Sequence, residues 1–434
     1  MLKKHAALMQ SLPQTRVSPR LLPRLAAVAA LCAFSPARGA DWPQWRGPAR
    51  DGISTETGLL KEWPAGGPKL AWRAGNLGGG YSGISVAAGR IFTMGDAADS
   101  SFLHALDEAT GKLIWSLKIG ATGGESGNRY PGTRCTPTVD GNLVFTTGQW
   151  GDLVCAETAS GREIWRRSLT KDLNGRMMSH WGYSESPLVD GDRLLCTPGG
   201  SGGTMVALNK QTGAVIWRTR GWTDRAAYSS IIVATLGGVR QYVQLTDAHV
   251  AGVNPADGKV LWKAPRAGRT AVIPTPIVDG NLVYVVSGYN VGCHLFQVDA
   301  VDGRFTAREV YANKEIKNHH GGVLKIGPHV VGFSDNDGWV WQDLRTGAAV
   351  FKADLKKLGK GSLTAADGML YLRAEGKTGT VVLLDAATPG WNEKGRFDQP
   401  GRSDKHSWPH PVIANGRLYL RDQDILLAYA IKPR

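Results

Sequence analysis

The sequence predicts an all-β fold, an eight-bladed β-propeller built from four-stranded antiparallel blades. The first observation is a segment, 103–115, that recurs along the chain around a turn glycine, with a tryptophan four residues after the glycine in the first four copies. The turn glycines lie 50, 52, 45, 45 and 44 residues apart, at Gly111, Gly161, Gly213, Gly258, Gly303 and Gly347. Four short strands fit this period, whereas ankyrin and tetratricopeptide repeats are shorter and helical.

The second observation gives the number of blades. Upstream of each recurring turn, the sequence has an apolar strand, a turn and another strand. This pattern occurs at 84–92, 137–145, 187–195, 231–243, 276–285, 322–331, 363–372 and 411–420. We therefore expect eight blades in one continuous domain over residues 69–434, since the repeat is unbroken.

The ends of the chain predict how the ring closes. The eighth unit ends near residue 431 with only three strands, and residues 69–72 form an outermost strand with nothing before it. We expect the N-terminal strand to complete the C-terminal blade, because closure removes the exposed edges of an open array.

Each recurring segment is a strand, a turn and a returning strand. Residues 103–106 alternate as a strand does, 107–111 supply a turn in which glycine can adopt positive φ, and 112–115 return. The recurrent tryptophan is a large apolar plate on the outermost strand, suited to packing against the next blade. These structural positions are Gly111, Trp115, Gly161, Trp165, Gly213, Trp217, Gly258 and Trp262.

The repeat Ala-x-(Asp/Asn/Glu)-x-x-(Thr/Ser)-Gly-x-x-x-Trp resembles the pyrroloquinoline-quinone (PQQ) enzyme repeat, and the predicted ring resembles the eight-bladed PQQ-like propeller. Segments 41–48, 317–322 and 421–424 are similar to a bacterial secreted subgroup of that family. The family includes quinoprotein dehydrogenases and a non-catalytic outer-membrane assembly lipoprotein. The resemblance therefore implies a fold more strongly than a function.

Residues 1–40 have the composition of a secretory signal peptide. They contain six basic residues and no acidic one, followed by an apolar run at 25–34 and a cleavage point near Ala40. The run is far shorter than the ~20 residues of a membrane span. We expect a periplasmic or secreted protein with no transmembrane span after cleavage and with an N-terminal extension, 41–68, before the propeller. Translation starts at either Met1 or Met9.

Removal of residues 1–40 changes the net charge from +14 to about +8, since 45 lysines and arginines then face 37 acidic residues. Scattered charge on an exported chain argues against nucleic acid as a partner. We expect a monomer, and we expect its partner to be an envelope protein or a polysaccharide. Four cysteines remain, and we expect free, buried thiols. They are Cys135, Cys155, Cys196 and Cys293.

The inner strands of a propeller begin around one mouth of the central channel, so polar residues far apart in sequence converge there. The candidates for ligand binding are Tyr81, Arg134, Trp181, Glu185, Tyr228, His319, His320, Asp404, His406 and His410. They form a ligand pocket, an acid/base pair or a metal site, for which Glu185, His320 and His410 are the candidate ligands. Alternatively, the histidines only satisfy backbone groups of the loops.

Three functions follow from this pattern. The first is a non-catalytic exported binding or scaffold module that acts through the polar mouth of its channel. The second is a PQQ- and calcium-dependent dehydrogenase of an alcohol or sugar, for which the resemblance implies Glu185 as a calcium ligand and Trp222 as a stacking plate. The vicinal cysteines and the haem segment of many such enzymes are missing. The third is a metal-dependent hydrolase or lyase that uses the histidines.

Overall fold

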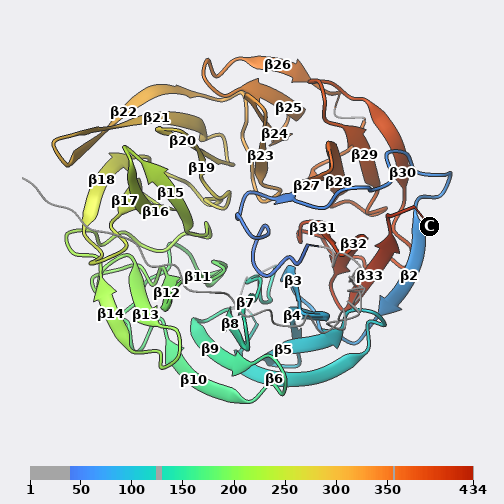
Figure 1. The fold of residues 1–434 in the computed structure, drawn as a ribbon, viewed down its shortest axis with the longest axis horizontal. Helices are drawn as coiled ribbons and strands as arrows, with labels where there is room; N and C mark the ends of the chain where they lie inside the picture. The colour runs from blue at the N-terminus through green and yellow to red at the C-terminus, as the bar shows by residue number, and fades with distance from the viewer. Residues whose placement is uncertain (1–39, 124–129, 355–356, 434) are drawn as a thin grey trace, which may run out of the picture. The chain divides into compact units, whose positions relative to one another are not determined.

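A computed structural model describes residues 40–123, 130–354 and 357–433. The expected signal peptide lies outside these ranges except for Ala40. The regular secondary structure of the described residues is β-strand, and none of their segments is a helix able to cross a membrane. The described residues belong to one compact unit, in which eight sheets stand around a common centre (Figure 1).

Blades 1 to 4 each consist of four strands that follow one another in the chain from the centre outward. Blade 1 has β3 (Ile84–Ala87), β4 (Arg90–Ala97), β5 (Ser100–Asp107) and β6 (Leu113–Ala121). Blade 2 has β7 (Thr138–Asp140), β8 (Leu143–Thr147), β9 (Asp152–Glu157) and β10 (Glu163–Ser168). Blade 3 has β11 (Leu188–Asp190), β12 (Arg193–Cys196), β13 (Val206–Asn209) and β14 (Val215–Arg218). Blade 4 has β15 (Ile232–Leu236), β16 (Val239–Leu245), β17 (His249–Val253) and β18 (Val260–Pro265).

Blades 5 to 7 repeat this antiparallel order. Blade 5 has β19 (Ile277–Asp279), β20 (Leu282–Ser287), β21 (Gly292–Val301) and β22 (Arg304–Asn313). Blade 6 has β23 (Val323–Ile326), β24 (His329–Ser334), β25 (Gly338–Asp343) and β26 (Ala349–Lys352). Blade 7 has β27 (Gly361–Ala366), β28 (Met369–Ala374), β29 (Val381–Asp385) and β30 (Glu393–Phe397), and β1 (Ile53–Ser54) adds a parallel strand beside β27.

The eighth blade closes the ring as the sequence predicts. It has β31 (Val412–Ala414), β32 (Arg417–Asp422) and β33 (Ile425–Ala430), and its outermost strand is β2 (Lys69–Ala74) from the start of the chain. β2 and β33 are antiparallel, with Lys69 opposite Ala430 and Ala74 opposite Leu426. The predicted eight-bladed propeller is confirmed.

Burial explains the pattern of residues in each blade. Second strands such as β20, LVYVVS, are buried along their whole length and are continuously apolar or small, as expected between two neighbouring sheets. The outermost strand β22 alternates between exposed and half-buried residues. The four cysteines are buried and unpaired, in accordance with the sequence prediction.

Aromatic residues of the outermost strands lock adjacent blades together. The indole of Trp115 lies against Gly161 of the next blade, and its Nε1 donates a hydrogen bond of 3.1 Å to the carbonyl oxygen of Thr158. Trp72, Trp165 and Trp217 make equivalent contacts with the next turn glycine. A side chain at these glycines would overlap the ring, so the recurring glycine provides space for the tryptophan of the preceding blade.

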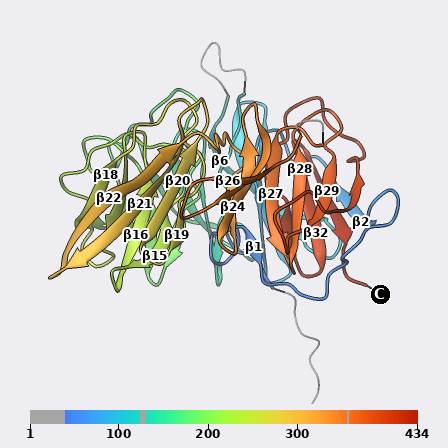
Figure 2. The same cartoon turned by 90° about the horizontal axis from the view of Figure 1, so that it is seen from above.

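Trp262 departs from this arrangement. Its Nε1 donates a hydrogen bond of 2.7 Å to Gln241 Oε1 within blade 4, and no atom lies within 4 Å of a side chain built at Gly303. The reason is that Gly303 belongs to a tight turn between two ten-residue strands, β21 and β22. This hairpin reaches outward beside β18 in Figure 2.

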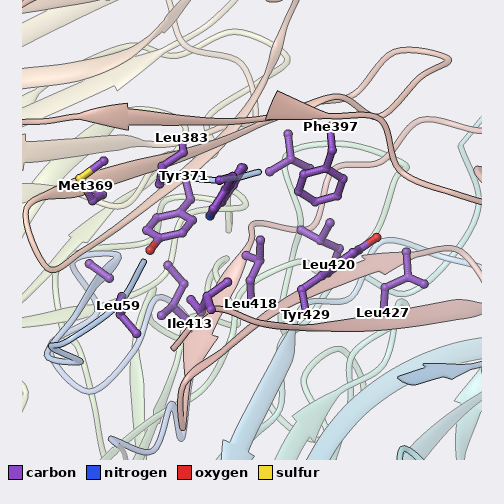
Figure 3. Close-up of a cluster of buried hydrophobic side chains, with 14 of the residues drawn as sticks. Leu59, Met369, Tyr371, Leu383, Phe397, Ile413, Leu418, Leu420, Leu427 and Tyr429 are labelled. Carbon is purple, nitrogen blue, oxygen red and sulfur yellow. The ribbon is translucent and has the colours of Figure 1, made fainter. Parts of the chain in front are cut away.

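The hydrophobic core lies between neighbouring blades. Figure 3 shows one cluster between blades 7 and 8, in which Tyr371 and Leu383 face Leu418 and Leu427. Leu59 from the N-terminal extension joins the same cluster and is 3% exposed. The extension is therefore packed onto the ring.

Residues 42–54 of the extension run along the inner strands at the centre of the ring (Figure 1). The Arg46 guanidinium donates a hydrogen bond of 2.6 Å to the carbonyl oxygen of Val323 in blade 6. The Arg50 guanidinium donates to the carbonyl oxygens of Ser186, at 2.7 Å, and Pro187, at 3.1 Å, which lead into blade 3. Both arginines are buried, so this segment links blades that are distant in sequence.

Candidate ligand-binding site

A cavity of about 300 Å³ lies where the inner strands of the blades begin. The residues that precede the inner strands line it, because every blade starts on the same side of the ring. Eight of the ten candidate residues lie in its wall, namely Tyr81, Arg134, Trp181, Tyr228, His319, His320, His406 and His410. Tyrosine, tryptophan and histidine rings dominate the wall.

Tyr81 and Trp408 form the closest ring contact in the wall. They precede the inner strands of blades 1 and 8, and their ring centroids are 4.0 Å apart with planes inclined by 25°. Cζ of Arg134 lies 5.5 Å from the centroid of the Tyr81 ring, within the range of a cation–π interaction. The three side chains support one another as one side of the cavity.

Backbone carbonyl groups hold Arg134 in place. Its guanidinium donates hydrogen bonds to the carbonyl oxygens of Gly132, at 2.8 Å, Trp181, at 3.1 Å, and Tyr130. Burial lowers the pKa of Arg134, although an arginine still keeps its charge at neutral pH. Among the described residues, Arg134 forms no ion pair within 4 Å, so it adds positive potential to the cavity.

The second polar group is formed by two consecutive histidines. His320 Nε2 lies 2.5 Å from Glu375 Oε2, and Lys360 Nζ lies 2.5 Å from His319 Nδ1. The ammonium group of Lys360 also lies 3.1 Å from Asp335 Oδ1. Neutral His319 accepts a hydrogen bond from Lys360, since an ammonium group has donors only.

Burial disfavours the charged forms of His319, His320 and Glu375. It raises the pKa of Glu375 to about 7, against the opposing effect of Lys360. Burial, assisted by Lys360, lowers the pKa of His319 to about 3, and burial also lowers the pKa of His320. The cavity wall therefore presents neutral imidazoles and a carboxyl group that titrates near neutral pH.

Trp45 and His410 meet in another part of the wall. Their ring centroids are 4.8 Å apart, and Trp45 comes from the N-terminal extension rather than from a blade. His410 Nε2 lies 3.2 Å from the carbonyl oxygen of His320, and burial lowers the pKa of His410 to about 3. The extension therefore contributes directly to the cavity.

Glu185 does not line the cavity, contrary to the prediction. It is 5% exposed, and its carboxyl group accepts hydrogen bonds from Thr197 N, at 2.6 Å, Thr197 Oγ1, at 2.9 Å, and Gln244 Nε2, at 3.1 Å. Burial raises the pKa of Glu185 to about 7. Glu185 lies in the segment before β11, as expected, but its side chain points between blades 3 and 4, toward Thr197 and Gln244.

Asp404 and Trp222 also lie outside the cavity wall. Asp404 is exposed in the loop before β31 and is not part of the wall, since this loop extends toward solvent before Trp408 returns to the cavity. Trp222, which the PQQ resemblance implied as a stacking plate, is completely buried among the core residues of blades 3 and 4.

The donor set does not fit calcium. Calcium takes six to eight oxygen ligands, usually with several carboxylates. Glu375 is bound to His320, Asp335 is paired with Lys360, and the oxygens of Glu185 are engaged by Thr197 and Gln244. Within the described ranges, no three His, Cys, Asp or Glu side chains are grouped so as to hold a metal ion.

Several wall residues were not among the candidates, and they include Trp45, Tyr130, Tyr289, Lys360, Glu375 and Trp408. Two of them follow the end of a second strand, since Tyr289 comes shortly after β20 and Glu375 directly after β28. A second strand runs antiparallel to the first and so returns to the same mouth. Aligning the ends of the second strands would therefore have found both.

Comparisons with known proteins identify the repeats. A family model described as outer membrane protein assembly factor BamB matches residues 98–352. The outer membrane protein assembly factor BamB of Burkholderia pseudomallei (strain K96243) is 24% identical over 369 residues, which cover 75% of this chain and 91% of that protein.

Solved structures share the fold. BamB from Moraxella catarrhalis superimposes with a TM-score of 0.55 at 15% identity, covering 80% of this chain and 96% of that chain. Quinohemoprotein alcohol dehydrogenase from Comamonas testosteroni gives a TM-score of 0.59 at 12% identity, covering 91% of this chain and 81% of that chain. At such identities, the likeness concerns the propeller alone.

Proposed function

Because the chain belongs to the family of the outer membrane protein assembly factor BamB, with its PQQ-like repeats, we propose that it is an exported, non-catalytic binding module of the bacterial envelope. The observation that carries this proposal is the aromatic cavity at the channel mouth, to which all eight blades are directed. A concave site lined by rings, with a few convergent polar groups, is the usual form of a ligand-binding pocket.

The polar groups of the cavity favour binding over catalysis. His320 and Glu375 bond to each other, and Lys360 bonds to His319 and Asp335. These contacts orient the side chains and reduce their net charge. The most accessible part of the wall consists of rings such as Tyr289, which is 43% exposed at the rim. Rigid aromatic rings supply contact area at low cost in side-chain entropy.

The expected signal peptide and the name of the relatives support a site of action in the envelope. The partner is then an envelope component, either a protein segment or a glycan, that inserts into the cavity. Residues 42–54 run along the inner strands and occupy the centre of the ring. The ligand is therefore expected to enter the cavity through the mouth.

The proposal is tested by thermal denaturation of the purified protein with solubilised envelope material from the same bacterium. A ligand that binds only the folded state raises the midpoint of unfolding. We expect the wild type to be stabilised, and Trp408→Ala to lose this effect. Trp391→Ala is the matched control, because Trp391 lies before the outermost strand of blade 7 and not in the cavity.

Equal stabilisation of the wild type and Trp408→Ala would contradict the proposal. The absence of any stabilisation by the envelope material would contradict it as well. Circular dichroism spectra of the variants show whether the propeller is intact before the comparison is made.

A further inference from the structure

We propose that the cavity binds a sugar residue that bears a carboxylate, such as a uronic acid of an acidic polysaccharide. This inference rests on the proposed function and specifies its ligand. Three properties of the cavity carry it, namely the arrangement of its rings, the kinds of polar edge it exposes and the position of its cations.

The most nearly parallel rings of the wall do not form a slot for a flat ligand. A planar ring between two aromatic faces requires them to be roughly 7 Å apart, twice the ~3.5 Å contact distance of carbon atoms. The two pairs nearest to parallel are Tyr81 with Trp408, at 4.0 Å, and His406 with Trp408, at 6.0 Å. Both pairs are too close to hold a planar aromatic ring between them.

Inclined rings suit a non-planar ligand instead. The rings of His319 and His320 are inclined by 82°, those of His320 and Trp408 by 70°, and those of Tyr289 and His319 by 76°. Such walls present ring faces beside ring edges that bear hydroxyl or nitrogen groups. A sugar ring has the matching alternation of apolar C–H faces and equatorial hydroxyl groups.

The accessible polar groups can serve both as donors and as acceptors. Tyr130, Tyr289, His319 and His406 are half-buried or exposed residues of the wall. Phenol hydroxyls combine one donor with acceptor capacity, and the imidazole of His319, whose Nδ1 accepts from Lys360, offers Nε2–H as a donor, so the wall suits a ligand rich in hydroxyl groups. The volume of about 300 Å³ is at the lower end of the range for small-molecule pockets and limits the ligand to one or two rings.

Two cations determine the charge of the ligand. Arg134 and Lys360 both line the cavity, and the buried Arg46 lies near His410. Of the nearby acidic groups, Asp335 is paired with Lys360, and Glu375 is bound to His320. Arg134 is left without an ion-pair partner within 4 Å among the described residues, so a carboxylate on the sugar is attracted, and a cationic ligand is repelled.

The test is calorimetric titration of the purified protein with three probes: α-1,4-digalacturonate, neutral galactobiose and terephthalate, a planar aromatic dianion. We expect one-to-one binding of digalacturonate about tenfold tighter than that of galactobiose, and no binding of terephthalate. Lys360→Gln should weaken the binding of digalacturonate about tenfold, which corresponds to the loss of one partly buried charge contact. Arg345→Gln should have no effect, because Arg345 is 73% exposed on the outer part of blade 6.

Tyr289→Ala is a second variant, which removes an aromatic ring at the rim and no charge, and we expect weaker binding of both sugars. Preferential binding of galactobiose or of terephthalate would overturn the inference, as would unchanged affinity in Lys360→Gln. If no sugar binds while the stabilisation by envelope material still depends on Trp408, the acidic-sugar inference is overturned, and the proposed function stands. Digalacturonate binding that is insensitive to Trp408→Ala would place its site outside the cavity and overturn the inference.

Discussion

The indole Nε1 of Trp45 donates a hydrogen bond of 3.0 Å to Thr275 Oγ1, although 230 residues separate the two. This bond fixes the N-terminal extension against the residues that lead into blade 5. Because the Trp45 ring also lines the cavity, the cavity wall combines loops of the blades with a segment that precedes them in the chain. The extension is therefore part of the site as well as of the core.

Trp45→Phe should weaken ligand binding and lower the free energy of unfolding by about 1 kcal/mol, the usual net value of one hydrogen bond. Urea denaturation and ligand titration measure the two effects. The matched control is Trp391→Phe, which removes an equal 3.0 Å bond from indole Nε1 to Glu393 Oε2 away from the cavity. Equal ligand affinity in both variants would show that Trp45 has only a structural role.

Glu375 should make stability depend on pH. Its pKa is raised from the ordinary carboxyl range to about 7 in the folded protein, so the folded state binds the proton more tightly than the unfolded state. The stabilisation is fully present below about pH 4.5 and is lost as the pH rises through 7. Its size is on the order of 3 kcal/mol for the full shift.

Glu375→Gln keeps a donor for His320 Nε2 and does not titrate. Relative to the wild type, this variant should gain stability between pH 5 and pH 8, measured by urea denaturation at both values. A difference in free energy of unfolding that stays constant across this range would disprove the role of Glu375.

Glu185→Gln should lower stability by about 1–3 kcal/mol and leave ligand affinity unchanged. The new amide would place donor hydrogens toward the donating Nε2 of Gln244, which now lies 3.1 Å from Glu185 Oε1. Glu309→Gln is the control for loss of a carboxylate outside the cavity, because Glu309 lies on the exposed strand β22 with one side-chain partner, His294 Nδ1 at 3.0 Å. Loss of ligand binding in Glu185→Gln would place this residue in the site after all.

Gly213→Ala should destabilise the contact between blades 2 and 3. A Cβ atom at Gly213 would lie 2.8 Å from Cε3 of Trp165, and the backbone there has a φ of +69°. Gly191→Ala has a similar φ of +58° and nothing within 4 Å, so it reports the backbone strain alone. We expect thermal denaturation to show a further loss of about 1–3 kcal/mol in Gly213→Ala, and equal losses would contradict the packing role.

The repeat made the fold predictable from sequence. The glycine and tryptophan spacing specifies one blade, and Trp72, a tryptophan without its preceding strands, indicates how the ring closes. The exception is Trp262, because its partner turn became the longer β21–β22 hairpin, which local spacing does not reveal.

The site was only partly predictable. Topology brings the residues before each inner strand to one mouth, which is why His319 and Trp181 were found. Side-chain direction does not follow from topology, so Glu185 was placed in the cavity although it is held by Thr197 and Gln244. Trp45 carries no repeat signature, and its position depends on how Arg46 and Arg50 anchor the extension.

The most direct test of binding through the cavity is site-specific photo-crosslinking in living cells. A photoreactive phenylalanine analogue replaces Tyr289, which is 43% exposed at the rim, or Val301, which is 68% exposed at the end of β21. Binding at the mouth predicts a discrete envelope adduct from position 289 that disappears when Trp408→Ala is added, and none from position 301. An adduct at position 301 alone, or an adduct at position 289 that persists in the Trp408→Ala variant, would contradict binding at the mouth.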